Sequence, residues 1–239
     1  MVKWGLKGWG FTVFQFKFWH SLLNPSSLTY ALEHKDEYEK IRGYRRSFWL
    51  VFFSALLLFA LRNIWGMNTS ALTTLFATGL DDRYMFARYI SLGSSVLWAI
   101  GFFLFHYYAV AYFLHLLTEL PFKWIQKVQL YVISFIVVEK AITFIAFIIV
   151  GYATPYTFFS LAPTLFTFVQ HDYVLYFVNQ LTVATIATIW VQYRFLSQWD
   201  EGNRKVLMAK IIVIQIILAL IVAAISILPV FNWLTRGAN

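Results

Sequence analysis

The stretch Val128–Tyr152, VQLYVISFIVVEKAITFIAFIIVGY, is twenty-five residues long and contains only two charged residues, Glu139 and Lys140. A helix needs about 20 predominantly apolar residues to cross the hydrocarbon core of a bilayer. The stretch is therefore long enough and apolar enough to span a membrane. A later placement, about 141–161, would put Pro155 inside the helix, where it removes a backbone hydrogen bond. We favour the earlier placement.

The composition of the whole chain agrees with this interpretation. The chain has 239 residues, of which 60% are hydrophobic and 13% are charged. A soluble domain would carry about a quarter charged residues. An ordinary water-soluble enzyme, a disordered chain and a fibrous repeat are therefore excluded. The chain has no cysteine, which excludes disulfides, thiolate metal sites and cysteine nucleophiles.

Four other stretches of the chain resemble the first in length and low charge. We therefore expect an all-α polytopic membrane protein with five transmembrane helices in one bundle, residues 47–233, after a short cytoplasmic N-terminal arm, residues 1–46. The predicted spans are about 47–65, 90–114, 128–152, 173–193 and 211–233.

The distribution of lysine and arginine predicts the orientation of these spans. Fourteen of them lie in the arm and in the two loops on the same side, and four lie on the opposite side. Positive residues accumulate in cytoplasmic loops. We expect the N-terminus to be cytoplasmic and the C-terminus to lie outside or in a lumen.

The arm mixes aromatic residues with lysines, a composition typical of segments in the headgroup layer. Alternatively, its rings pack on the cytoplasmic ends of the bundle. A helix is expected to begin at Ser26 or Ser27 and to stop at Gly43. Its mixed charges indicate a solvated surface, so we expect no nucleic-acid partner. The predicted interfacial anchors are Trp4, Trp9, Trp19, Arg45 and Arg46.

Two charges near the middle of a span are a functional-site hypothesis by default, since they are costly in lipid. Glu139 and Lys140 point about 100° apart on a helix, so each needs a partner from another span. The candidates are His106 in the second span and Asn179 and Gln180 in the fourth. A contact between Glu139 and His106 would form a titratable pair, suited to a proton or ion route. The alternative is a polar plug that fixes how the helices assemble.

Signatures of catalysis are missing from the sequence. It has no Gly-rich phosphate loop, no His-Glu-x-x-His pair and no Gly-x-Ser-x-Gly elbow, and its five histidines do not pair as ligands. We expect no catalytic residue, no metal and no cofactor. A lipid-acting membrane enzyme is the remaining enzyme alternative, and its candidate residues are Asp81, Asp82, His171 and Asp172.

Three features of the layout, besides the five spans, resemble one known family. They are the opening Leu23-Asn24-Pro25, the stretch Tyr112–Val128 that runs through Pro121-Phe122-Lys123, and the polar segment Gln198–Lys210. Over about residues 22–230 the chain resembles the bacterial branch of the Yip (Ypt-interacting protein) family. Eukaryotic members of the family bind Rab-type GTPases through a long cytoplasmic arm with an Asp-Leu-Tyr-Gly-Pro type motif. This chain lacks both features, so the resemblance does not carry GTPase binding to it.

The resemblance implies a non-enzymatic role in a bacterial cell membrane. Some bacterial relatives accompany ABC-type exporters that protect against toxic peptides. The resemblance therefore implies an accessory or scaffold protein with membrane-protein partners, and a homo-oligomer is an open alternative. A second hypothesis, based on the midplane residues, is a small transporter or channel for protons, ions or small solutes.

Overall fold

The computed structural model describes residues 14–15, 18–26, 30, 32, 41–67, 69, 72, 77, 81–200 and 202–227. Nearly all regular structure in these residues is helical. The exception is a parallel pair of two-residue strands, β1 (Phe14–Gln15) and β2 (Ile41–Arg42). The all-α prediction is confirmed at this level.

The helices follow one another along the chain as follows. They are α1 (Phe18–Leu23), α3 (Tyr44–Trp65), α5 (Asp81–Leu104), the π-helix η3 (Phe105–Val110), α6 (Ala111–Thr118), α7 (Phe122–Val150), α8 (Ala162–Leu165), α9 (Asp172–Gln180), α10 (Val183–Leu196) and α11 (Arg204–Ser226).

Among the described residues, four helices are long and apolar enough to cross a membrane. They are Tyr44–Trp65, Asp81–Thr118, Phe122–Val150 and Arg204–Ser226. In lipid a helix satisfies its own backbone polar groups, which is why long apolar runs adopt this structure. The four helices are consistent with an integral membrane protein.

The second predicted span, 90–114, is part of a much longer helix. α5, η3 and α6 run on without interruption from Asp81 to Thr118, 38 residues in all. The helix begins nine residues before the predicted start of the span. The charged residues in its first turns are compatible with helical geometry, although they are not apolar. The helix stops at Glu119, which has a left-handed backbone with φ 60°.

Helix α7 ends close to the end predicted for the third span, and a helix over 141–161 is wrong. α7 ends at Val150, and Gly151 closes it with φ 83°. A left-handed residue at this position is a common helix stop that favours glycine. The helix begins at Phe122, six residues before the predicted start, directly after Pro121.

The prediction of one helix over 173–193 is wrong. The segment is divided into α9 and α10, which are separated at Leu181 and Thr182. Thr182 and Thr185 form a capping box that starts α10. This local cap gives the chain a second helix start inside an uncharged run, and an apolar composition does not reveal it.

Two predicted helices near the chain ends differ from the structure in their bounds. α11 starts seven residues before the predicted 211, after an Asn203 cap, and residues 228–233 of the predicted span lie outside the described residues. The arm helix expected to reach Gly43 does not include Ile41 or Arg42, which pair with β1 instead. Most of the rest of that expected helix also lies outside the described residues.

The predicted anchors are placed only in part. Trp19 on α1 is 69% exposed. Arg45 and Arg46 are exposed in the first turn of α3. Trp4 and Trp9 lie outside the described residues. The exposed positions of Trp19 and the two arginines are compatible with a headgroup environment, which stays a prediction.

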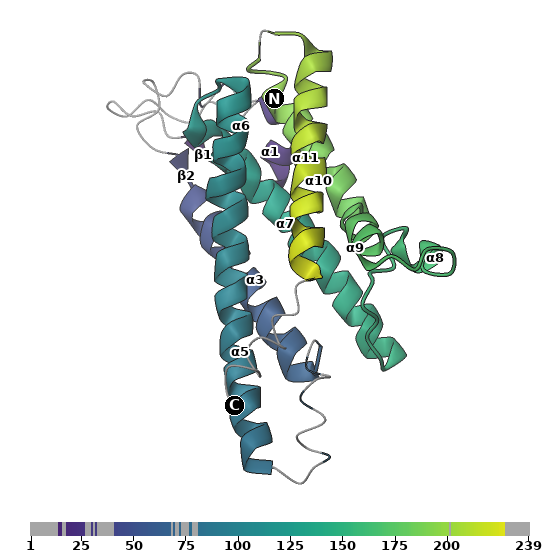
Figure 1. Cartoon of the computed structure of the whole chain (residues 1–239). Helices are drawn as coiled ribbons and strands as arrows, with labels where there is room; N and C mark the ends of the chain where they lie inside the picture. Colours follow the sequence, from purple (N-terminus) through teal and green to yellow (C-terminus); the bar gives the residue numbers. More distant parts are fainter. Residues whose placement is uncertain are drawn as a thin grey trace.

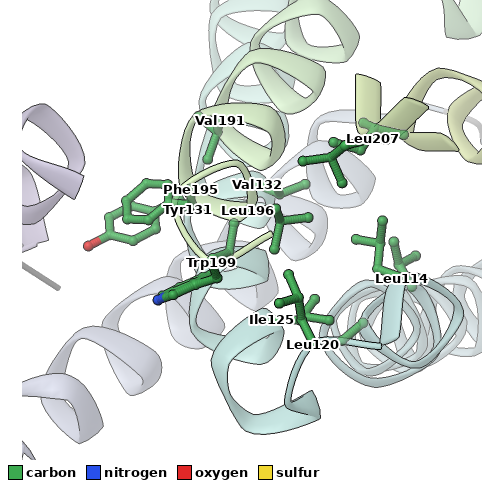
Figure 2. Close-up of a cluster of buried hydrophobic side chains, with 14 of the residues drawn as sticks. Leu114, Leu120, Ile125, Tyr131, Val132, Val191, Phe195, Leu196, Trp199 and Leu207 are labelled. Carbon is green, nitrogen blue, oxygen red and sulfur yellow. The ribbon is translucent and has the colours of Figure 1, made fainter. Parts of the chain in front are cut away.

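Helix α7 is the element around which the others pack (Figure 1). It contacts α3, η3, α6 and α10, and α11 packs on α6, α9 and α10. Figure 2 shows part of the largest buried cluster, where side chains from α6, α7, α10 and α11 meet. In this cluster the rings of Tyr131 on α7 and Phe195 on α10 stack at 5.3 Å. This contact helps to hold the last turn of α10 against α7, at the end of α10 opposite to its break from α9.

Candidate functional site

The carboxyl group of Glu139 lies at the start of α10. Its Oε2 atom accepts a hydrogen bond of 2.6 Å from the backbone N–H of Ala184, the second residue of that helix. The first N–H groups of a helix have no partner within the helix, and the helix dipole favours negative charge there. The half-buried Glu139 thus provides, from α7, an acceptor that α10 lacks.

The backbone around the break is satisfied by threonines. The hydroxyl of Thr185 donates to the carbonyl of Gln180 at 2.6 Å, and the N–H of Thr182 donates to the Thr185 hydroxyl at 3.4 Å. Non-helical backbone at membrane depth is tolerated only where such partners exist or where it lines a cavity. The break between α9 and α10 is therefore stabilised by specific hydrogen bonds of the chain.

The loop after α7 is tied to the same place. The side-chain oxygen of Asn179 accepts from the N–H of Thr157 at 2.8 Å and from the hydroxyl of Ser160 at 3.1 Å. Ser160 also forms a β-bridge with Thr182. The hydroxyls of Thr143 on α7 and Thr157 lie 3.3 Å apart. We call the polar residues of this junction the break cluster: Glu139, Thr143, Thr157, Ser160, Asn179, Thr182 and Thr185.

The structure brings together only some of the predicted midplane residues. Glu139 and Asn179 meet in the break cluster, whereas the Gln180 amide donates to its own helix, at Tyr176, over 3.4 Å. His106 lies in the π-helix η3, and its Nδ1 is 3.0 Å from the carbonyl oxygen of Phe102. The hypothetical contact of Glu139 with His106 is not formed, since the hydrogen bonds of both groups go elsewhere.

Lys140 points away from the break cluster, as its helical position predicts. It lines a cavity of about 470 Å³ between α3, α5 and α7, together with Arg62. Within the described part of the chain, Lys140 makes no hydrogen bond and no ion pair. The two adjacent charges of α7 therefore have separate surroundings.

A second polar group lies along the interface of α7 and α10. The side chain of Gln215 on α11 donates to the amide oxygen of Gln192 at 3.2 Å. The amide nitrogen of Gln192, the hydroxyl of Thr188 and both amide atoms of Gln129 are buried without a hydrogen-bond partner among the described residues. Buried polar atoms of this kind commonly bind internal water. The sequence pattern marks Ala184 and Thr188 only as small residues spaced for close helix packing, and it does not mark Gln129.

The candidates for a lipid-acting enzyme are in separate elements. Asp81 and Asp82 begin α5, while Asp172 begins α9 directly after His171. In the described ranges, no group of three or more histidine, aspartate or glutamate side chains could hold a metal ion.

No family model, no curated protein and no solved structure matches this chain. The Yip resemblance stays a prediction from the layout of the sequence.

Proposed function

We propose that this protein is a non-catalytic integral membrane protein that serves as an accessory or scaffold for a membrane partner, with an ABC-type exporter as the partner class. The observation that carries the proposal is the length of the helix Asp81–Thr118, which has 38 residues. At 1.5 Å per residue it is about 57 Å long. A bilayer with its headgroups is about 40–45 Å thick. Unless it tilts by about 40°, one end of this helix stands clear of the membrane.

The start of α5 is the end of this long helix that we place outside the membrane. It extends beyond the ends of α3 and α7 (Figure 1) and begins with Asp81, Asp82 and Arg83, which suit water. Phe86 and Tyr89 follow and are each 68% exposed, and α3 is the main helix that packs against α5. Exposed aromatic rings beside charged residues are typical of surfaces that bind another protein.

The proposal includes five crossings of a bacterial cell membrane, with a cytoplasmic N-terminus and an outer C-terminus. In this topology α9 and α10 together form one broken crossing. Their 9 and 14 residues would cover about 35 Å, enough for a hydrocarbon core of about 30 Å. The lysine and arginine distribution and the resemblance to the Yip family support this arrangement.

The partner can be sought by photo-crosslinking from two positions of the same long helix. We expect a benzoyl-phenylalanine at Phe86 to crosslink to another membrane protein in native membranes, because Phe86 lies on the projecting half. The matched control is the same group at Phe113 on α6, where the ring is 49% exposed and is expected to label lipid. Lipid adducts alone from both positions, or the same protein adducts from both, would contradict the proposal.

A small transporter of protons or small polar solutes is the second candidate. The broken helix and the unpartnered polar atoms of Gln129, Thr188 and Gln192 favour it. Transporters commonly bind substrates at discontinuous helices near the membrane midplane. In this candidate, internal water along the α7–α10 interface would connect the break cluster to Gln192 and Gln215.

Proteoliposomes with an entrapped pH dye test this candidate directly. If protons move along the interface, Gln192→Leu should abolish most of the flux, because it replaces the polar side chain in the middle of the route with an apolar one. Gln170→Leu, at an exposed position, should leave the flux unchanged. A parent protein without measurable flux would remove the candidate and leave the accessory role in place.

A further inference from the structure

The cavity beside Lys140 is lined by two positive charges, and none of the described residues that line it is acidic. Its polar lining consists of Arg62 and Asn63 on α3, Ser91, Ser94 and Ser95 on α5, and Lys140 on α7. The Nε atom of Arg62 is buried and has no hydrogen-bond partner in the described part of the chain. Neither cation forms an ion pair with a carboxylate among the residues that the structure describes. Unpaired cations inside a membrane bundle are costly and mark functional sites.

The nearby charged groups do not neutralise this pair. Glu139 is next to Lys140 in the sequence, but its carboxyl group accepts from Ala184 at the start of α10. Even with Glu139 counted as an anion, the region keeps one net positive charge. Arg88 is also a cation and cannot neutralise the pair. Its Nη2 already donates to the carbonyls of Asn63 and Ile64, at 3.1 and 3.0 Å.

The hydroxyl groups of the cavity can donate hydrogen bonds to a ligand. The amide of Asn63 donates to the Ser91 oxygen at 2.8 Å, so the Ser91 hydroxyl proton is free for another acceptor. Ser94 and Ser95 have no hydrogen bond to another described residue. Three hydroxyls beside a guanidinium and an ammonium make a set of donors with a surplus of positive charge. Oxyanions are the ligands that such a set recognises, and the planar guanidinium fits their geometry.

The shape of the cavity allows such a ligand to enter from the side of the bundle. Ser94 and Trp98, which both line it, are exposed on α5. Phe59 forms an apolar wall, and the Arg62 guanidinium lies 5.5 Å from the centre of its ring. The cavity volume of about 470 Å³ is within the range of sites that bind small ligands.

We propose that this cavity binds a phosphate group through Arg62, Lys140 and the serine hydroxyls of α5. The phosphate can belong to an anionic lipid headgroup that enters from the side or to a small soluble phosphate. The site does not depend on the accessory role or on the transport role, because it uses neither the projecting start of α5 nor the break cluster.

The test uses the full-length protein in mild detergent and two phosphate probes. The lipid arm measures retention of phosphatidylglycerol against phosphatidylcholine by native mass spectrometry. The soluble arm measures binding of inorganic phosphate by calorimetry. We expect the double variant Arg62→Gln, Lys140→Met to bind the anionic probe about tenfold more weakly or not at all, because both charged donors are lost. Preferential retention of phosphatidylglycerol alone identifies a lipid headgroup, and binding of inorganic phosphate identifies a soluble source.

Two further variants distinguish binding in the cavity from nonspecific attraction of the anionic probe to the positive charge of the protein. Arg83→Gln removes one arginine from the exposed start of α5 and should leave binding unchanged. Ser95→Phe keeps both cations but fills the cavity, and it should abolish binding. Removal of unpaired cations from a membrane bundle should not unfold it, which the melting temperature without probe checks. The proposal is overturned if neither probe binds the parent, or if the double variant or Ser95→Phe binds as the parent does.

Discussion

Replacing Glu139 with leucine is expected to lower the free energy of unfolding by about 1.5–3 kcal/mol, the usual range for hydrogen bonds to charged groups. The backbone N–H of Ala184 would lose its acceptor at 2.6 Å, at the start of a helix that begins inside the bundle. The leucine cannot replace this acceptor, and the unpaired N–H would stay buried. Hydrogen exchange of the amides over 183–186 should accelerate, and unfolding in mixed detergent micelles should give the change in free energy.

The conservative variant separates the hydrogen bond from the presence of a polar side chain. Glu139→Gln keeps an oxygen that can accept from Ala184, so we expect it to lose less than half as much stability as Glu139→Leu. Gln170→Leu introduces the same leucine at an exposed position and serves as the control. If Glu139→Leu were as stable as the parent, the hydrogen bond from Glu139 to the start of α10 would not contribute to stability. The carboxyl group would then need a functional explanation.

Replacing Phe195 with alanine is expected to have the largest effect of the changes considered, about 3–5 kcal/mol of unfolding free energy. Phe195 is fully buried and stacks on Tyr131 at the junction of α7 and α10 (Figure 2). The loss combines missing contacts with a cavity that the surrounding helices cannot fill. Thermal unfolding in detergent, followed by circular dichroism, measures it.

The matched control removes a ring that has few protein contacts. Phe168 lies in the loop between α8 and α9 and is 81% exposed, so Phe168→Ala should change stability by less than about 0.5 kcal/mol. Phe195→Leu keeps most of the apolar volume and should lose only about 1–1.5 kcal/mol. Equal losses for Phe195→Ala and Phe168→Ala would show that the α7–α10 contact does not hold the bundle together.

The part of the fold that could be predicted from the sequence is the part that depends on short stretches of chain. The apolar length of 128–152, with Gly151 and Pro155 near its end, was enough to predict where α7 stops, because a left-handed glycine closes a helix through local geometry. The start of α7 at Phe122 was missed. The polar first turns continue the helix beyond its apolar part, and a search for apolar length ends at the first lysines.

The division of 173–193 into α9 and α10 shows what such reasoning cannot reach. Every residue of that run is uncharged, and an uncharged run of this length is compatible with one continuous helix. The break depends on acceptors and donors from elsewhere in the chain: Glu139 on α7, and Thr157 and Ser160 in the loop. These partners lie between 19 and 45 residues away in sequence, so their contribution exists only after folding.

The amino-acid sequence by itself determined the all-helical class and the end of α7, since apolar length and helix stops act over one or two turns. It also marked Glu139 and Lys140 as unusual, because charges within an apolar run are costly wherever the run is placed. Only the tertiary structure decided what each charge faces. Adjacent residues on a helix point about 100° apart. Packing of α7 against both α10 and α3 therefore gave Glu139 a helix start to cap, and left Lys140 in a cavity with Arg62.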